Sequence, residues 1–201
     1  MAKVMNPPQI TNKQIGKIQD LLGAALRKAG LVSEPVQTII ETCGKTLVSD
    51  LVGVIRKHVE AVSNLLVRRV KVNRTLTPEE MLKATGRAVY ADGNVVKNMP
   101  KGEGEEAEVI FFQLGRYVSD DDLEKEYDLR GLKPADPYSL GAVNKSIPPF
   151  ADSHPNGTHW KDAEGKWCYA TFYRFLDDRD VYVYRGDNDW NGGWWFAGLR
   201  K

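Results

Sequence analysis

Residues 157–201 read GTHWKDAEGKWCYATFYRFLDDRDVYVYRGDNDWNGGWWFAGLRK. All five tryptophans of this 201-residue chain lie in the segment, together with 12 of its 19 aromatic residues. Aromatic side chains are costly to leave in water, and each can bury a large area. We therefore expect this segment to hold either the main core or an exposed binding surface.

The same segment alternates in a way that predicts an antiparallel meander. THWK and KWCYATFYRF flank the turn DAEG (162–165), in which Gly165 supplies the positive φ of a hairpin. DVYVYR (180–185) predicts the next strand, and WWFAGLRK follows a polar loop. Cys168, Ala170 and Phe172 share a small, aliphatic side that is typical of a core. The opposite side is aromatic. Two alternatives follow for it: helices cover this side, or it is a binding surface.

Outward from this segment, the middle of the chain alternates short strands and capped helices. Residues 65–72 alternate as a strand, with a helical continuation as the alternative, and AEVIFFQL (107–114) predicts a buried strand. Thr77, Ser119 and Asp136 are suited to cap three helices. Asp120, Asp121, Asp122 and Glu124 are interpreted as the acid-rich first turn of a solvated helix rather than as a site for a divalent ion.

Two amphipathic helices are predicted before residue 64. The first runs from Thr11 or Asn12 to Ala29, and the second begins at Ser33. The second carries an apolar series at steps of three and four: Val36, Ile40, Cys43, Leu47, Leu51, Val54, His58 and Val62. From Ile40 the steps give an eleven-residue repeat, and Gly44 and Gly53 either allow a partner helix to approach closely or mark a break.

Two helices of this kind cannot cover each other fully, so we expect them to dock onto the body or to self-associate. The partner face comprises Ile40, Leu47, Leu51, Val54 and Val62. The predicted fold class is α+β, with a helical arm at residues 1–64 and a body at residues 65–201 that ends in an antiparallel β-meander.

Charge divides the chain at the same place. Residues 1–75 hold 12 Lys and Arg against 5 Asp and Glu, whereas the remainder holds 16 against 22. The two parts attract each other within the fold or between protomers, or the basic part binds a polyanion. The distant Cys43 and Cys168 indicate no disulfide framework, which favours a cytoplasmic location, and no run is apolar enough to span a membrane.

Three groups of residues are candidates for function. A basic cluster near the junction suits phosphate contacts, although no helix-turn-helix or RNA-binding signature accompanies it; it comprises Arg56, Lys57, Arg68, Arg69, Lys71 and Arg74. An aromatic set suits stacking on a sugar or base, or closes a packed core; it comprises Tyr182, Tyr184, Trp190, Trp194 and Trp195.

The third group has metal-ligand or catalytic residue types: Asp152, His154, His159 and Cys168. It lacks the CxxC or HxxxH spacing of a zinc site, and Cys168 lies in the middle of a strand, where reactive cysteines are unusual. Hydrogen-bonding loop residues and a buried thiol explain the group better. We expect no cofactor.

Part of the chain resembles a group of uncharacterised bacterial or phage proteins. The resemblance is carried by RGLKPADPYSLGAVNKSIPPFADSHPNGTHWKDAEGKWCYATFYRF, WWFAGLRK and EEMLKATGR, and it covers roughly Thr77 to Lys201. It implies a compact C-terminal body and no particular activity, cofactor or catalytic residue.

The sequence therefore favours a non-enzymatic interaction or assembly protein that self-associates or docks a protein partner through its helices. The first alternative is a regulator that binds nucleic acid through the basic cluster. The second is a small hydrolase-like or metal site around His154 and His159.

Overall fold

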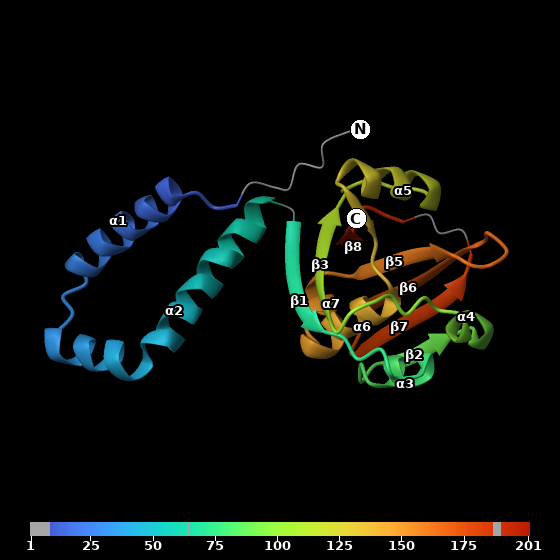
Figure 1. Cartoon of the computed structure of the whole chain (residues 1–201), viewed down its shortest axis with the longest axis horizontal. Coiled ribbons are helices and arrows are strands. Elements are labelled where there is room, and N and C mark those ends of the chain that lie inside the picture. Colours follow the sequence, from blue (N-terminus) through green and yellow to red (C-terminus); the bar gives the residue numbers. More distant parts are fainter. Residues whose placement is uncertain (1–8, 64, 187–189) are drawn as a thin grey trace. The chain divides into compact units, whose positions relative to one another are not determined.

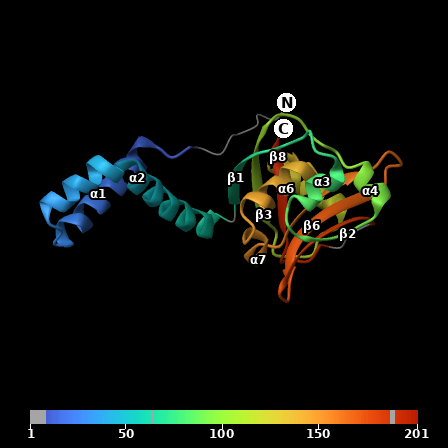
Figure 2. The same cartoon turned by 90° about the horizontal axis from the view of Figure 1, so that it is seen from below.

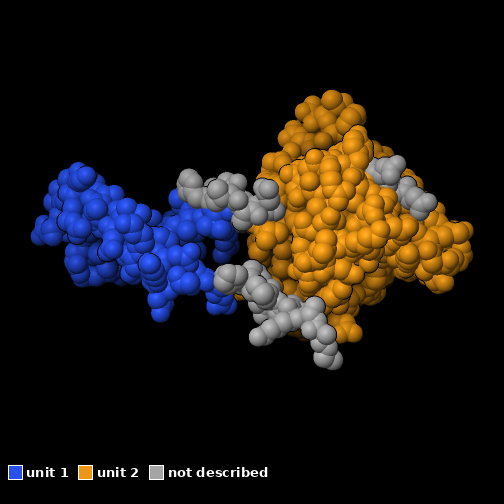
Figure 3. Space-filling view, turned by 90° about the horizontal axis from the view of Figure 1, so that it is seen from above, with its two compact units in different colours: residues 1–62 blue, residues 63–201 orange. Residues whose placement is uncertain are grey.

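A computed structural model describes residues 9–63, 65–186 and 190–201, without the side chains of residues 57, 58 and 60–63. The chain divides into two compact units, Met1–Val62 and Ser63–Lys201 (Figure 3). Within the described residues, no helix combines the length and the apolarity that crossing a membrane requires.

The first unit consists of helices α1, Asn12–Lys28, and α2, Ser33–Ser63 (Figure 1). Thr11 caps α1 as predicted: its hydroxyl accepts a hydrogen bond from the Gln14 N–H, and the Gln14 side chain accepts one from the Thr11 N–H at 2.8 Å. Gly30 follows with a φ of 64°, which suits a helix stop. The helix α2 continues through Gly44 and Gly53 without a break.

The second unit is a mixed β-sheet with helices on both of its faces. Its strands are β1 (Leu65–Lys71), β2 (Ala88–Ala91), β3 (Glu106–Gln113), β4 (Leu132–Pro134), β5 (Asn156–Lys161), β6 (Trp167–Phe175), β7 (Asp178–Arg185) and β8 (Trp195–Arg200). Its helices are α3 (Pro78–Lys83), α4 (Gly93–Lys97), α5 (Asp120–Leu129), α6 (Pro137–Ser146) and α7 (Phe150–Ser153). The α+β class is confirmed, and Thr77, Ser119 and Asp136 cap α3, α5 and α6 as predicted.

The strand order is β1-β3-β8-β5-β6-β7-β2, and β4 pairs with β8. The strands β5, β6 and β7 form the expected antiparallel meander. The last strand does not extend it, because β8 lies between β3 and β5 and runs parallel to β5. The sheet is therefore mixed, and β2 also pairs in parallel with β7.

The helices α3, α4, α6 and α7 lie on one face of the sheet, and α5 lies on the other (Figures 1 and 2). The larger core cluster fills the first side and includes Phe111, Phe172 and Val183. The smaller cluster fills the side of α5 around Tyr127 and Trp190, both fully buried. The predicted core side of β6, with Cys168, Ala170 and Phe172, is confirmed as buried.

Candidate functional site

The described residues of the first unit carry a broad apolar surface and bury no hydrophobic side chain. Of the hydrophobic side chains that are buried in the described chain, none precedes Leu66, and α1 contains no buried residue. Fourteen large hydrophobic residues of this unit are more than a third exposed: Ile10, Ile15, Leu21, Leu22, Leu26, Leu31, Val32, Ile39, Ile40, Leu47, Val48, Val52, Val54 and Val59. We call α1 and α2 with these residues the arm.

The predicted partner face lies on this surface. Ile40 and Val54 are each 54% exposed and Leu47 is 41% exposed, whereas Leu51 is half-buried. The side chain of Val62 lies outside the described residues. Exposed apolar side chains also flank the series at Ile39, Val48 and Val52, so the surface is wider than a single stripe.

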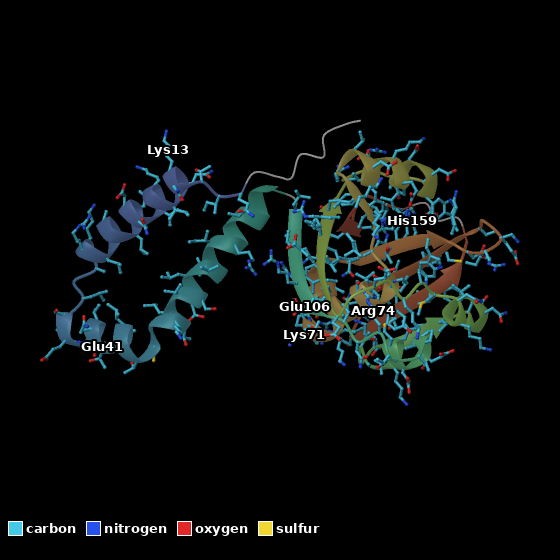
Figure 4. The ribbon with its side chains drawn as sticks, viewed as in Figure 1. Lys13, Glu41, Lys71, Arg74, Glu106 and His159 are labelled. Atoms are coloured by element: carbon cyan, nitrogen blue, oxygen red, sulfur yellow. The ribbon has the colours of Figure 1, made fainter. Side chains whose placement is uncertain are left out.

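The members of the basic cluster that lie in the second unit take part in different contacts. Arg74 is held inside the second unit by Asp136, with Nη1 2.8 Å from Oδ1, and its guanidinium also reaches the backbone of Gly104 and Lys101. Figure 4 shows Arg74 among the side chains of the second unit. Arg69 pairs with Glu108 at 2.7 Å, and Arg68 lies over the Phe150 ring at 5.0 Å.

Among the described side chains of the cluster, only that of Arg74 forms an ion pair with Asp136. Lys71 is exposed at the end of β1, Arg56 is exposed on α2, and the side chain of Lys57 lies outside the described residues. Phosphate binding through this cluster stays a prediction.

The ligand-type residues occupy separate environments. Asp152 receives three hydrogen bonds from Arg179, at 2.6, 2.9 and 3.2 Å, and these bonds lower the pKa of its carboxyl group. His154 stacks on Phe150, and His159 contacts α5. Within the part of the chain that the structure describes, no group of three or more His, Cys, Asp or Glu residues is placed to hold a metal ion.

Cys168 is buried, as the sequence predicted for this thiol. Burial raises its pKa, and the neighbouring charge of Asp162 adds to the effect. A thiol with a raised pKa is a poor nucleophile. These four residues therefore do not combine into a catalytic centre.

His159 instead belongs to a buried polar network that the sequence did not indicate. Its Nδ1 lies 2.6 Å from Asp120 Oδ1, and the same oxygen accepts a hydrogen bond of 2.8 Å from the indole of Trp190. The ring of Trp167 stacks on the imidazole with centroids 4.5 Å apart. The network thereby joins the first turn of α5 to strand β5.

Two carboxylates set the ionisation of His159. Burial disfavours the charged imidazole, but Asp120 and Glu124 outweigh burial and raise the pKa of His159 above its usual value. Glu124 Oε1 lies 3.0 Å from Nε2 in an ion pair whose direction does not suit a hydrogen bond. The arrangement stabilises a protonated histidine, and its 0% side-chain exposure leaves no access for a substrate.

The interpretation of Asp120 as part of a solvated first turn was wrong, because Asp120 is only 4% exposed. A signal was present in the sequence. Asp120, Leu123 and Tyr127 follow steps of three and four, which place Asp120 on the buried side of α5.

The aromatic set divides between both faces of the sheet. Trp190 is fully buried beneath α5, and Trp195 contacts His154 on the opposite face. Tyr182 stacks between Tyr90 and Tyr173, at 4.8 and 5.4 Å between centroids. Tyr184 and Trp194 flank this stack and are half-buried.

Stacking covers both faces of the Tyr182 ring, so this ring offers no open flat surface to a sugar or base. The most exposed ring of the tyrosine stack is Tyr90, at 46%. The geometry favours packing of this part of the sheet over recognition of a planar ligand.

Comparisons with protein-family models, with curated proteins and with solved structures find no match for this chain.

Proposed function

We propose that this protein is a non-enzymatic assembly protein whose arm self-associates with the arms of other copies. The observation that carries the proposal is the arm itself: among its described residues, fourteen large hydrophobic side chains are exposed and no hydrophobic side chain is buried. Large contiguous apolar surfaces on soluble proteins mark interaction sites.

The size of the surface supports a stable assembly. Full burial of a Val, Leu or Ile side chain stabilises by roughly 1.5–3 kcal/mol, so covering the exposed parts of fourteen gains on the order of 10–20 kcal/mol per arm. Association costs roughly 4–15 kcal/mol in lost translational and rotational freedom. Two arms that cover each other therefore gain more than association costs.

The charges of the two helices favour a second copy as the occupant. The helix α1 carries four basic residues and one acidic residue, whereas α2 carries three basic and four acidic residues. The α1 helix of one copy and the α2 helix of another are therefore electrostatically complementary. Every copy carries both helices, so a single type of contact, α1 of one copy against α2 of another, pairs both helices of each copy.

The test is light scattering of the full-length protein on a sizing column, with absorbance read at 260 and 280 nm. We expect the wild type to elute as a protein-only oligomer and the double variant Leu47→Ser and Leu51→Ser to elute as a monomer. A matched double variant, Gln37→Ser and Lys45→Ser, places serine at polar positions of α2 and should remain oligomeric.

A monomeric wild type would contradict the proposal. A monomer that carries absorbance at 260 nm, removed by high salt, would instead support nucleic-acid binding. We also propose a cytoplasmic location, which the exposed free thiol of Cys43 supports, since free thiols are typical of reducing compartments.

A further inference from the structure

In the sheet of the second unit, strand pairing branches at β8. One edge of β8 pairs with β3, and the other edge is shared: its beginning pairs with β5 at Asn156 and Gly157, and its end pairs with β4 at residues 132–134. Beyond Gly157 the strand β5 leaves β8. Residues 158–161 of β5 therefore face β4 across a gap.

The backbone of β5 directs hydrogen-bonding groups into this gap. The carbonyl oxygen of Pro155 accepts a hydrogen bond of 2.8 Å from the Trp195 N–H of β8. Alternate residues of a strand direct their N–H and C=O groups to the same edge, so His159 and Lys161 present theirs on the edge of Pro155. On β8, the Ala197 carbonyl oxygen lies opposite this edge. It already accepts a hydrogen bond of 2.9 Å from the Ala135 N–H.

A hollow of about 490 Å³ occupies the gap, which is within the usual range of roughly 300–1,000 Å³ for ligand sites. Its lining comprises Pro100, Gly102, Glu103, Lys133, Pro134, Ala135, Asp136, His159, Trp160 and Leu199. The side chain of His159 points to Asp120 on the side of α5, so its backbone is the part that lines the hollow.

One wall of the hollow is already fixed. Gly102 has a φ of 67°, and a Cβ atom there would overlap the Asp136 carboxylate. Asp136 caps α6 through the Ser139 N–H and pairs with Arg74, which also holds the Gly104 carbonyl oxygen. The loop 100–104 is thus pinned against α6, and a ligand need not order it on binding.

The rest of the lining combines apolar side chains such as Trp160 and Leu199 with charged ones such as Lys133. The Thr158 hydroxyl of β5 donates to the Ala135 carbonyl oxygen at 2.6 Å and so links β5 to the residue that follows β4. Trp160 is half-buried and also borders a second hollow of about 420 Å³ beside Asp162 and Arg185. A ligand that follows the edge of β5 would pass along this indole ring.

We propose that this gap binds an extended peptide segment of a partner protein, which adds a short strand to the free edge of β5. The main chain of the segment bonds to the N–H and C=O groups of His159 and Lys161, and an apolar side chain packs on Trp160. Strand addition at an open edge is an established mode of peptide recognition in which main-chain hydrogen bonds supply affinity.

The gap suits this mode better than the outer edge at β1. The β1 sequence LLVRRVK carries three cations and no acidic residue, and charged residues on an edge discourage strand addition. The gap edge lies in a hollow instead, where apolar side chains such as Trp160 and Leu199 border it beside charges of both signs.

The experiment starts with a phage-displayed library of random 12-residue peptides selected on the immobilised full-length protein. An enriched peptide is synthesised, and its binding is measured by fluorescence anisotropy. N-methylation at each position in turn should weaken binding at least tenfold at every second residue within the bound stretch, because a strand directs alternate N–H groups to its neighbour. In the wild-type complex, amide hydrogen exchange at His159 and Lys161 should slow.

Two variants localise the binding. Trp160→Ala should weaken the peptide at least tenfold, whereas Trp194→Ala, on the opposite face of the sheet, should leave its affinity unchanged. The arm variant Leu47→Ser and Leu51→Ser should also bind normally, so this inference stands or falls separately from self-association.

Failure to enrich any peptide would overturn the proposal. So would an enriched peptide that leaves exchange at His159 and Lys161 unchanged, or whose N-methyl scan lacks the alternation.

Discussion

The ionisation of His159 depends on contacts that only the fold brings together. Asp120 and Glu124 raise its folded-state pKa above the unfolded value of about 6.5. The resulting stability is fully present below about pH 6.5 and is lost as the pH rises through the folded pKa. The midpoint of urea unfolding should therefore fall on the alkaline side of pH 6.5, and His159→Gln should flatten that decline.

His154→Gln is the matched control, because His154 contacts Phe150 and Trp195 rather than the network of α5. The other groups that face His159 are Asp120, Glu124 and the phenol of Tyr127, whose pKa burial raises far above this range. If His159→Gln and wild type declined in parallel, the network would not control stability.

Leu176 is in a conformation that suits glycine. It is the only described non-glycine residue with a positive φ, 53°, and it follows Phe175 in the β6–β7 hairpin. A left-handed conformation costs an L-residue roughly 1–2 kcal/mol, and Leu176 is 80% exposed, so it contributes little packing. We expect Leu176→Gly to stabilise the protein by about 0.5–1 kcal/mol in urea unfolding, since glycine's own entropy cost offsets part of the relief.

Leu129→Gly provides the contrast, because Leu129 is equally exposed but ends α5. Glycine in a helix costs about 1 kcal/mol, so this variant should lose stability. Equal losses in both variants would show that the backbone at Leu176 carries no strain.

At the scale of elements, substitutions at Gly44 and Gly53 test whether another helix approaches α2 closely at these positions. A Cβ atom at either position meets nothing within 4 Å. Gly→Ala at each should therefore strengthen the helix by about 1 kcal/mol. We expect a larger circular dichroism signal at 222 nm and an unchanged oligomer on the sizing column.

Loss of the oligomer in either variant would contradict this expectation. It would place that glycine where two helices approach closely, because only an added methyl group separates the variant from the wild type. Gly30→Ala is an unsuitable comparison, since its φ of 64° strains any other residue.

Helices and strands could be predicted from the sequence where the pattern that specifies them lies within a few neighbouring residues. Thr77, Ser119 and Asp136 each accept a hydrogen bond from a residue three positions along the chain, and that spacing is visible in the sequence. The alternation of β6 likewise identified its buried side. The three residues of β4 are too few to show a period.

The position of β8 was not predictable for a different reason. Its pairing with β3 joins Phe112 to Phe196 across more than 80 residues, and no local pattern specifies such a partner. The gap between β4 and β5 follows from the pairings on the other edge of β8, which are also long-range, so neither the gap nor the backbone edge of His159 could be located from sequence. The network of Asp120, His159 and Trp190 depends on the same long-range arrangement.

At the scale of the whole molecule, the two units have different sources of stability. The second unit contains the buried core, with Trp190 and Phe172 among its fully covered side chains. The helices of the first unit bury no hydrophobic side chain among the residues that the structure describes, and isolated helices are marginal in water. The order of the arm should therefore depend on association, which mass action makes dependent on protein concentration.

The distribution of aromatic residues makes this prediction measurable. Residues 1–62 contain no Phe, Trp or Tyr, and all five tryptophans lie beyond residue 159. Tryptophan fluorescence therefore reports the second unit alone, whereas circular dichroism at 222 nm reports the helices of both. On heating, we expect an early dichroism transition whose midpoint rises as protein concentration rises from about 1 to 100 μM, by mass action. The fluorescence transition should stay at one temperature, and in the variant Leu47→Ser and Leu51→Ser the early transition should weaken or disappear. Coincident transitions at every concentration would instead mean that the arm is stabilised by its own chain, and self-association would then have no role in ordering it.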